Sequence, residues 1–301
     1  MRERAAVGEE FESLRNQAQQ AVDAGRLEEA SALIAEALTW AREHGTVPQF
    51  DHAVCNRAAI AIQLGKGEAE LPRLREILLR SGDLVNCRLA AYHISVYYQY
   101  AKNFEKSLFY ARIACDRAEK LGVDDWLAAS LNQVGNALLG DSLVEEACRE
   151  YERALALMPA DSRLGRALVL DNLGYGRILQ ARLPEGYTCL YQSLAILRRL
   201  GGERYQVIPR LDLCLAHIES GRYADAERHG TVALRLAEKT GQIDGVKNAL
   251  YLLGEAANLR GDFLAAESHF TRLQRDFYPG ETYLPGFLLA VDIRKFVNLH
   301  A

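Results

Sequence analysis

Amide side chains recur along this chain at an interval of about 40 residues. Counted from Asn16, successive steps of 40, 37, 40, 39 and 40 residues each reach another polar side chain. The series reads Asn16, Asn56, His93, Gln133, Asn172 and Asp212, and one further step of 40 residues reaches Leu252, which is apolar. An Asn or Gln side chain offers donor and acceptor groups together, as a peptide unit does. A ladder of such side chains could therefore hydrogen-bond the backbone of an extended polypeptide, whatever the sequence of that polypeptide.

Covalent chemistry has no comparable signal in the sequence. The motifs HExxH, GxxxxGK[ST], GxSxG and GxGxxG do not occur. The seven histidines show no metal-ligand spacing, and the six cysteines form no CxxC pair. Buried free thiols in a reducing compartment are therefore expected. We predict no catalytic residue, no metal and no cofactor, although a catalytic pair assembled from distant parts of the chain stays open.

Small residues recur with the same period and indicate the elements that must position these side chains. In the clearest copy, Gly135 is followed after 12 residues by Ala147 and after 7 more by Ala154. Two helices approach closely only where the side chains at their contact are small. Each copy therefore reads as two packed helices joined by a tight turn. The turns are predicted near Gly25, Gly65, Lys102, Ser142, Leu183, Gly221 and Gly261.

The pattern resembles the tetratricopeptide repeat, a helix–turn–helix unit of about 34 residues. The copies begin near residues 11, 51, 88, 128, 167, 207 and 247. They are thus longer than the usual unit and resemble the long-helix variants of kinesin light chains and of MalT-type bacterial regulators. The resemblance implies an all-α fold: a right-handed α-solenoid of about seven repeats, forming one superhelical domain over residues 1–301. Copy 2 departs most, because Pro72 lies in its second helix.

The resemblance also implies that defined positions of each first helix face a concave groove. The groove residues are predicted to be Tyr92, His93, Val96, Tyr100, Asn132, Gln133, Asn136, Asp171, Asn172, Tyr175, Asp212, Tyr251 and Glu255. The amides would hydrogen-bond a bound backbone, and the tyrosines would supply apolar pockets. The alternative is that these side chains only hydrate a wide groove or cap neighbouring helices.

One known binding mode of the family is not expected here. Some tetratricopeptide domains hold the acidic end of a chaperone in a clamp of Lys, Arg and Asn side chains. The three cationic positions of that clamp carry Asn132, Ile208 and Asp212 in this sequence. An acidic tail would meet no paired charge there, and the neighbouring aspartates would repel it.

The end of the sequence reads as a cap over residues 283–301 of the repeat array. A last helix is expected from about residue 286 to 299, with Phe287, Leu288, Val291 and Phe296 available for burial. Repeat arrays need such a cap to cover their final apolar face. The alternative is an exposed apolar patch that docks another protein or forms a homodimer with a second copy.

Composition narrows the class of partner. The formal net charge is −4, from 36 basic and 40 acidic residues, and no dense basic cluster occurs. Nucleic acid and anionic membranes are therefore not expected as partners. The sequence shows neither an apolar run of about 18 residues nor a signal peptide, which favours the cytoplasm.

Together these observations predict a non-enzymatic scaffold or adaptor that binds a peptide or protein segment in its groove. The alternative is a regulator that responds to a peptide or small ligand, and an enzyme is a remote third.

Overall fold

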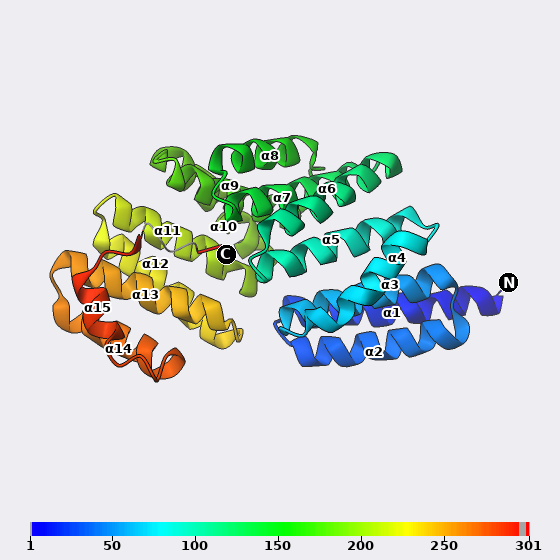
Figure 1. Cartoon of the computed structure of the whole chain (residues 1–301), viewed down its shortest axis with the longest axis horizontal. Coiled ribbons are helices and arrows are strands. Elements are labelled where there is room, and N and C mark those ends of the chain that lie inside the picture. Colours follow the sequence, from blue (N-terminus) through cyan, green and yellow to red (C-terminus); the bar gives the residue numbers. More distant parts are fainter. Residues whose placement is uncertain (1, 295–298, 301) are drawn as a thin grey trace. The chain divides into compact units, whose positions relative to one another are not determined.

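The computed structural model of the chain describes residues 2–294, 299 and 300, with side chains from residue 9 onward. Over these residues it contains fifteen α-helices, two short 3₁₀ helices and no strand (Figure 1). The all-α prediction is therefore confirmed. None of the helices in this part of the chain is long and apolar enough to cross a membrane. The helices form two compact units, residues 1–162 (unit 1) and residues 163–301 (unit 2), which we describe separately.

Unit 1 consists of four consecutive helix pairs. The helices are α1 (Arg2–Asp23), α2 (Leu27–His44), α3 (Val47–Gln63), α4 (Leu71–Arg80), α5 (Leu84–Tyr100), α6 (Phe104–Leu121), α7 (Asp124–Gly140) and α8 (Val144–Leu157). Each first helix packs against its own second helix, and the first helices α3, α5 and α7 also pack in series. The result is a layer of first helices backed by second helices, as in a tetratricopeptide array.

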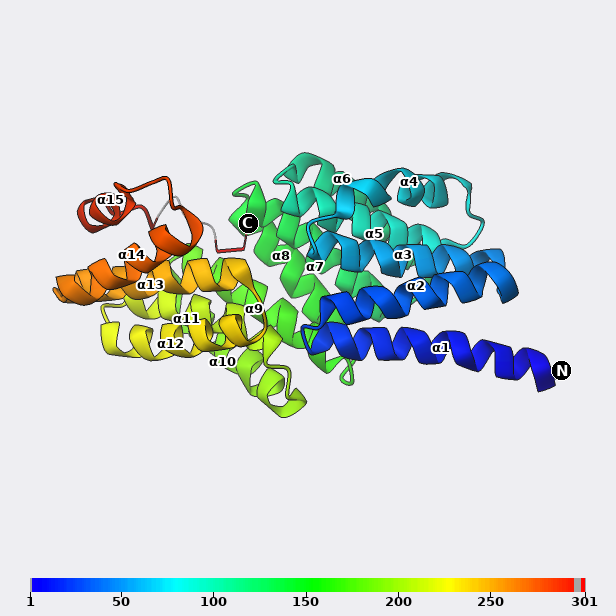
Figure 2. The ribbon, with the colours of Figure 1, turned by 90° about the horizontal axis from the view of Figure 1, so that it is seen from below.

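Unit 2 contains three further pairs and a last short helix. Its helices are α9 (Arg163–Leu179), α10 (Leu183–Leu200), α11 (Val207–Glu219), α12 (Tyr223–Lys239), α13 (Ile243–Arg260), α14 (Phe263–Phe277) and α15 (Leu284–Ala290). The first helices α9, α11 and α13 pack in series, and α15 lies against α13 and α14 (Figure 2). Each unit is thus an α-solenoid, and the seven predicted helix pairs are all present. That one superhelix runs through both units stays a prediction.

The small residues lie where the two helices of a pair meet. A Cβ added to Gly135 would stand 2.4 Å from the Tyr151 ring, and one added to Gly174 would stand 2.7 Å from Cγ of Leu190. Ala147 and Ala154 are completely buried. The helix contacts therefore need the small side chains whose spacing revealed the repeat.

The turns fall where the period predicts them, with one shift. Gly25, Gly65, Lys102, Ser142, Gly221 and Gly261 all have a positive φ. In copy 5 the positive φ belongs to Ala181 rather than Leu183. Ala181 follows Gly174 by 7 residues, the same offset that separates Ser142 from Gly135, so the repeat itself places the turn there. Leu183 is already the first residue of α10.

Copy 2 departs from the others as its proline predicts. A 3₁₀ turn, η1 (Gly67–Glu70), precedes α4, and Pro72 lies in the first turn of that helix. Because a proline cannot be accommodated further inside a helix, α4 begins there and has only 10 residues.

The expectation of a last helix from about 286 to 299 is wrong in its extent. Helix α15 ends at Ala290, and Val291 is extended. Leu288 is buried as expected, but Phe287 and Val291 are each 42% exposed; Phe296 lies outside the described residues. The β-branched residues Val291 and Ile293 flank Asp292, and all three are poor helix formers.

Candidate functional site

In unit 1, the predicted groove residues of α5 lie around a buried arginine. The Arg88 guanidinium carbon is 5.6 Å from the centre of the Tyr92 ring and 5.4 Å from that of Trp126. The His93 ring meets Tyr92 edge to face. Burial, aided by the charges of Arg88 and His52, lowers the pKa of His93 to about 3, so this imidazole is neutral at pH 7.

The other two predicted residues of α5 differ in exposure. Val96 is half-buried, and Tyr100, in the last turn of the helix, is exposed. Sequence reasoning missed Arg88 and Trp126. An arginine held between two aromatic rings can be recognised only when the neighbouring helix is in place.

The amides of α7 serve the packing of neighbouring helices. Gln133 is buried and donates to Oε1 of Gln99 at 2.9 Å and to Oγ of Ser95 at 3.2 Å. Oδ1 of Asn136 accepts a hydrogen bond from the Tyr151 hydroxyl at 2.9 Å. These two side chains therefore contact neighbouring helices, and their role in binding stays a prediction; Asn132 beside them is half-buried. Asn136→Ala should consequently affect folding as well as any binding.

In unit 2, two predicted carboxyl groups form a buried chain with a histidine. Asp171 on α9 and Asp212 on α11 are hydrogen-bonded to each other. Oδ2 of Asp212 also accepts from Nε2 of His300 at 2.8 Å. Burial and the nearby charge of Asp212 raise the pKa of Asp171 well above its usual range. Burial raises the pKa of Asp212 too, although His300 opposes this. Ionisation of Asp171 is therefore disfavoured beside the Asp212 carboxyl group.

The same face of unit 2 holds the backbone of Leu299. The Leu299 N–H donates to Oη of Tyr175 on α9 at 3.1 Å. Its C=O accepts from Nδ2 of Asn248 on α13 at 3.5 Å. The next residue, His300, stacks flat on the Tyr175 ring with 4.2 Å between ring centres. Side chains of two first helices thus bind both backbone polar groups of one residue, Leu299.

Described residues nearer to α15 contact later positions of α13. Arg294 forms ion pairs with Glu219 at 3.0 Å and Glu255 at 3.7 Å. Asn258, one turn further along α13, donates to the Leu289 C=O at 3.2 Å. Burial and the charge of Asp292 raise the pKa of Glu255 to about 7. Leu289, Arg294 and Leu299 therefore all contact first helices of unit 2.

We call this surface the acidic face and define it by six residues: Asp171, Tyr175, Asp212, Asn248, Tyr251 and Glu255. The structure brings together five of the residues that the sequence assigned to the groove, while Asn172 lies beside Asp171 and is half-buried. Sequence reasoning missed Asn248 and the segment that carries Arg294, Leu299 and His300. Asn248 could have been found, because the second position of the seventh copy is one that the resemblance assigns to the groove.

Ligand atoms of Asp171, Asp212 and His300 lie within 4.8 Å of one another. The sequence predicts no metal ligand. The 2.8 Å contact between His300 and Asp212 has the length of a direct hydrogen bond. The three groups are arranged as a hydrogen-bonded chain.

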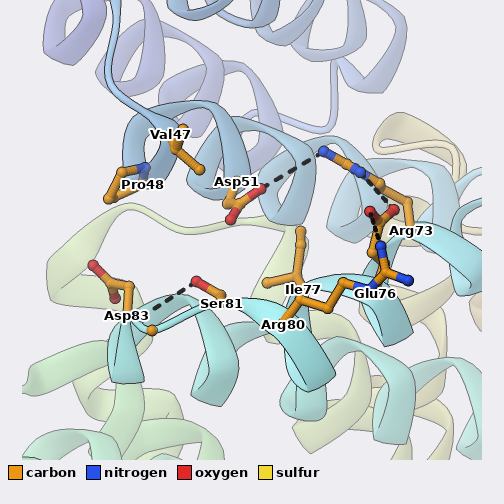
Figure 3. Close-up of a pocket in the computed structure, with 10 residues that line it drawn as sticks. Val47, Pro48, Asp51, Arg73, Glu76, Ile77, Arg80, Ser81 and Asp83 are labelled. Carbon is orange, nitrogen blue, oxygen red and sulfur yellow. Dashed lines mark hydrogen bonds and ion pairs between the residues drawn. The ribbon is translucent and has the colours of Figure 1, made fainter.

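A pocket of about 520 Å³ lies elsewhere, in unit 1. It is lined by the start of α3, by α4 and by residues 81–83 (Figure 3). Arg73 pairs with Glu76 at 2.5 Å and lies 3.8 Å from Asp51. None of the predicted groove residues lines this pocket. Because its charges pair with one another beside the shortened α4, we attribute it to the irregular second copy.

A second histidine cluster lies at the packing of α10, α11 and α12. The two ring nitrogens of His217 face the hydroxyls of Tyr187 at 3.2 Å and Tyr191 at 3.3 Å. The His229 ring stacks on His217. Burial is the main cause that lowers the pKa of each histidine to about 4. Both are therefore neutral in the folded protein at pH 7.

Acidification should destabilise unit 2 through this cluster. In the unfolded chain His217 and His229 become protonated near the ordinary histidine pKa of 6.5. In the folded chain both stay neutral until the pH falls to about 4. Stability is therefore lost as the pH falls from about 6.5, by about 1–2 kcal/mol per histidine at pH 5. Urea unfolding at pH 7 and pH 5 should show a smaller loss for His229→Gln than for the unaltered chain. Equal losses would contradict the prediction, because the two proteins share every other titrating group.

Comparisons with known proteins show the fold. No family model and no curated protein matches the chain. A Rap protein complexed with competence and sporulation factor matches with a TM-score of 0.72 at 14% identity, covering 93% of this chain and 80% of that one. A signal-transduction ATPase with a tetratricopeptide repeat sensor, from Pyrococcus horikoshii, matches with a TM-score of 0.62 at 15% identity, covering 93% and 46%. Kinesin-light-chain-type repeats from Podosopora anserina match with a TM-score of 0.50 at 15% identity, covering 62% and 92%. The chain therefore has a tetratricopeptide-type repeat fold.

Proposed function

We propose that this protein is a non-enzymatic interaction module whose acidic face binds a peptide segment of a partner protein. The observation that carries the proposal is the capture of both Leu299 backbone groups by Tyr175 and Asn248. These two side chains come from different first helices and bind main-chain groups that every polypeptide has. The same donors and acceptors can hold a segment from another chain.

Two further observations support this function over an enzymatic one. The buried carboxyl groups of Asp171 and Asp212 are already engaged in hydrogen bonds. The similar Rap structure is a complex with a competence and sporulation factor, so a related fold holds a separate ligand. The regulatory alternative uses the same face and differs in the size of the ligand; the similar array in the Pyrococcus protein is described as a sensor.

Selection from a peptide library tests the proposal. Peptides selected on the full-length chain should bind Asn248→Ala more weakly by about 0.5–1.5 kcal/mol, since one hydrogen bond to the ligand backbone is lost. Isothermal calorimetry measures the difference. Glu150→Ala is the control, because Glu150 lies on the second helix α8 and pairs with Arg153.

Two results would contradict the proposed function. Selected peptides that bind Asn248→Ala and the unaltered chain equally would place their site elsewhere. A chain that selects no peptide, even after Arg294→Ala and His300→Ala weaken the hold on its own segment, would not be a peptide-binding module.

A further inference from the structure

The acidic face has more hydrogen-bonding capacity than the segment on it uses. Among the described residues, Oδ1 of Asp171, Oδ1 of Asp212 and Oε1 of Glu255 are buried without a hydrogen-bond partner. The Tyr251 hydroxyl is also buried without a hydrogen-bond partner. A buried polar group without a partner is costly. A ligand that brought more N–H donors to this face would therefore bind better than the present occupant.

The charges define which donors would fit. Asp171, Asp212 and Glu255 are each at least 96% buried, with Glu219 at their edge. In the described part of the chain, the basic side chains that pair with Asp212, Glu219 and Glu255 are His300 and Arg294. Both belong to the segment after α15. The acidic face thus binds basic side chains, and in this structure those basic side chains come from the same chain.

Building on the function proposed above, we propose that the described residues after α15, through Arg294, Leu299 and His300, are an internal occupant of the acidic face. The partner is a basic peptide segment, with arginine and histidine side chains, that displaces it. Arginine suits the site best, because its five N–H donors match paired carboxylate oxygens.

The contacts of Arg294 make displacement feasible. Its guanidinium is held mainly within the segment itself, by Asp292 at 2.6 and 2.9 Å. Its approach to Glu255, at 3.7 Å, is longer than a hydrogen bond. A partner arginine that faces Glu255 directly could use donors that Asp292 occupies here. The internal segment has the advantage of a high effective concentration, so it should weaken the apparent affinity of an incoming peptide rather than abolish binding.

Competition between the two segments tests the proposal. The probe is a fluorescent synthetic peptide with the sequence of residues 289–301, measured by anisotropy against full-length protein. The double variant Arg294→Ala, His300→Ala should bind the probe at least about tenfold more tightly than the unaltered chain, because the internal segment no longer competes. The matched control, Arg275→Ala with His269→Ala on α14, should bind like the unaltered chain.

Changes to the probe test the chemical class of the ligand. Replacing its own arginine and histidine, at the positions of Arg294 and His300, with glutamate should abolish binding to the double variant. Asp212→Asn, added to the double variant, should weaken binding of the original probe by about tenfold, since the histidine loses a charged partner. If the double variant folds poorly by circular dichroism, Arg294→Gln with His300→Gln serves in its place.

The results separate this inference from the proposed function. Equal affinities of the unaltered chain and the double variant would overturn internal competition. Library peptides that require Asn248 but carry no excess of arginine or histidine would overturn the basic ligand and leave the proposed function standing. A concentration-dependent dimer lost in the double variant would make a second copy the occupant and overturn a separate partner.

Discussion

Leucine in place of Gly135 should lower the free energy of unfolding by about 1–3 kcal/mol, and by more if the helix pair cannot separate. A Cβ at this position would stand 2.4 Å from the Tyr151 ring. Tyr151 is completely buried, and its hydroxyl is bonded to Asn136. The ring therefore cannot swing away without breaking a buried hydrogen bond. Gly174→Leu should cost less, because it meets the flexible side chain of Leu190.

Urea and thermal unfolding of the full-length chain measure this effect. Gly82→Leu is the matched control, since an added Cβ there would meet nothing within 4 Å. The control should unfold like the unaltered chain. If Gly135→Leu and Gly174→Leu did the same, the repeat register that places these glycines at the helix contacts would be wrong.

Periodicity predicts the fold well because each repeat makes the same local demands on the backbone. Lys102 and Ser142 show this clearly: neither is a glycine, yet the period places a turn at each and both have a positive φ. Ala181 lies 7 residues after Gly174, as Ser142 lies 7 residues after Gly135, and it too has a positive φ. The position within the repeat, rather than the type of residue, therefore locates each turn.

The role of each groove position is harder to predict, because the neighbouring helix decides it. Asn136 and Tyr175 occupy the same position of copies 4 and 5, and the sequence assigned both to ligand binding. Asn136 accepts a hydrogen bond from Tyr151, a residue of its own second helix. Tyr175 instead accepts one from Leu299. Leu299 is 124 residues from Tyr175 in the sequence, and no local sequence pattern predicts such a contact.

Tyr175→Ala should have the largest effect of any change to the acidic face. Tyr175 is only 1% exposed, so loss of its ring should cost about 3–5 kcal/mol of unfolding free energy. The same change removes the acceptor for the Leu299 N–H and the surface on which His300 stacks. The segment should then leave the face, and the Leu299 amide should exchange with solvent as in an unstructured peptide.

Tyr175→Phe separates the ring from the hydroxyl. It keeps the stacking surface and removes one hydrogen bond, so it should cost about 0.5–1.5 kcal/mol and only partly expose the Leu299 amide. Hydrogen exchange at Leu299, read by NMR or mass spectrometry beside urea unfolding, distinguishes the two variants. Unchanged protection of Leu299 in Tyr175→Ala would contradict the contact itself. Full exposure in both variants would show that the hydroxyl, and not the stacked ring, holds the segment. Aromatic stacking and backbone capture would then no longer act together on this face.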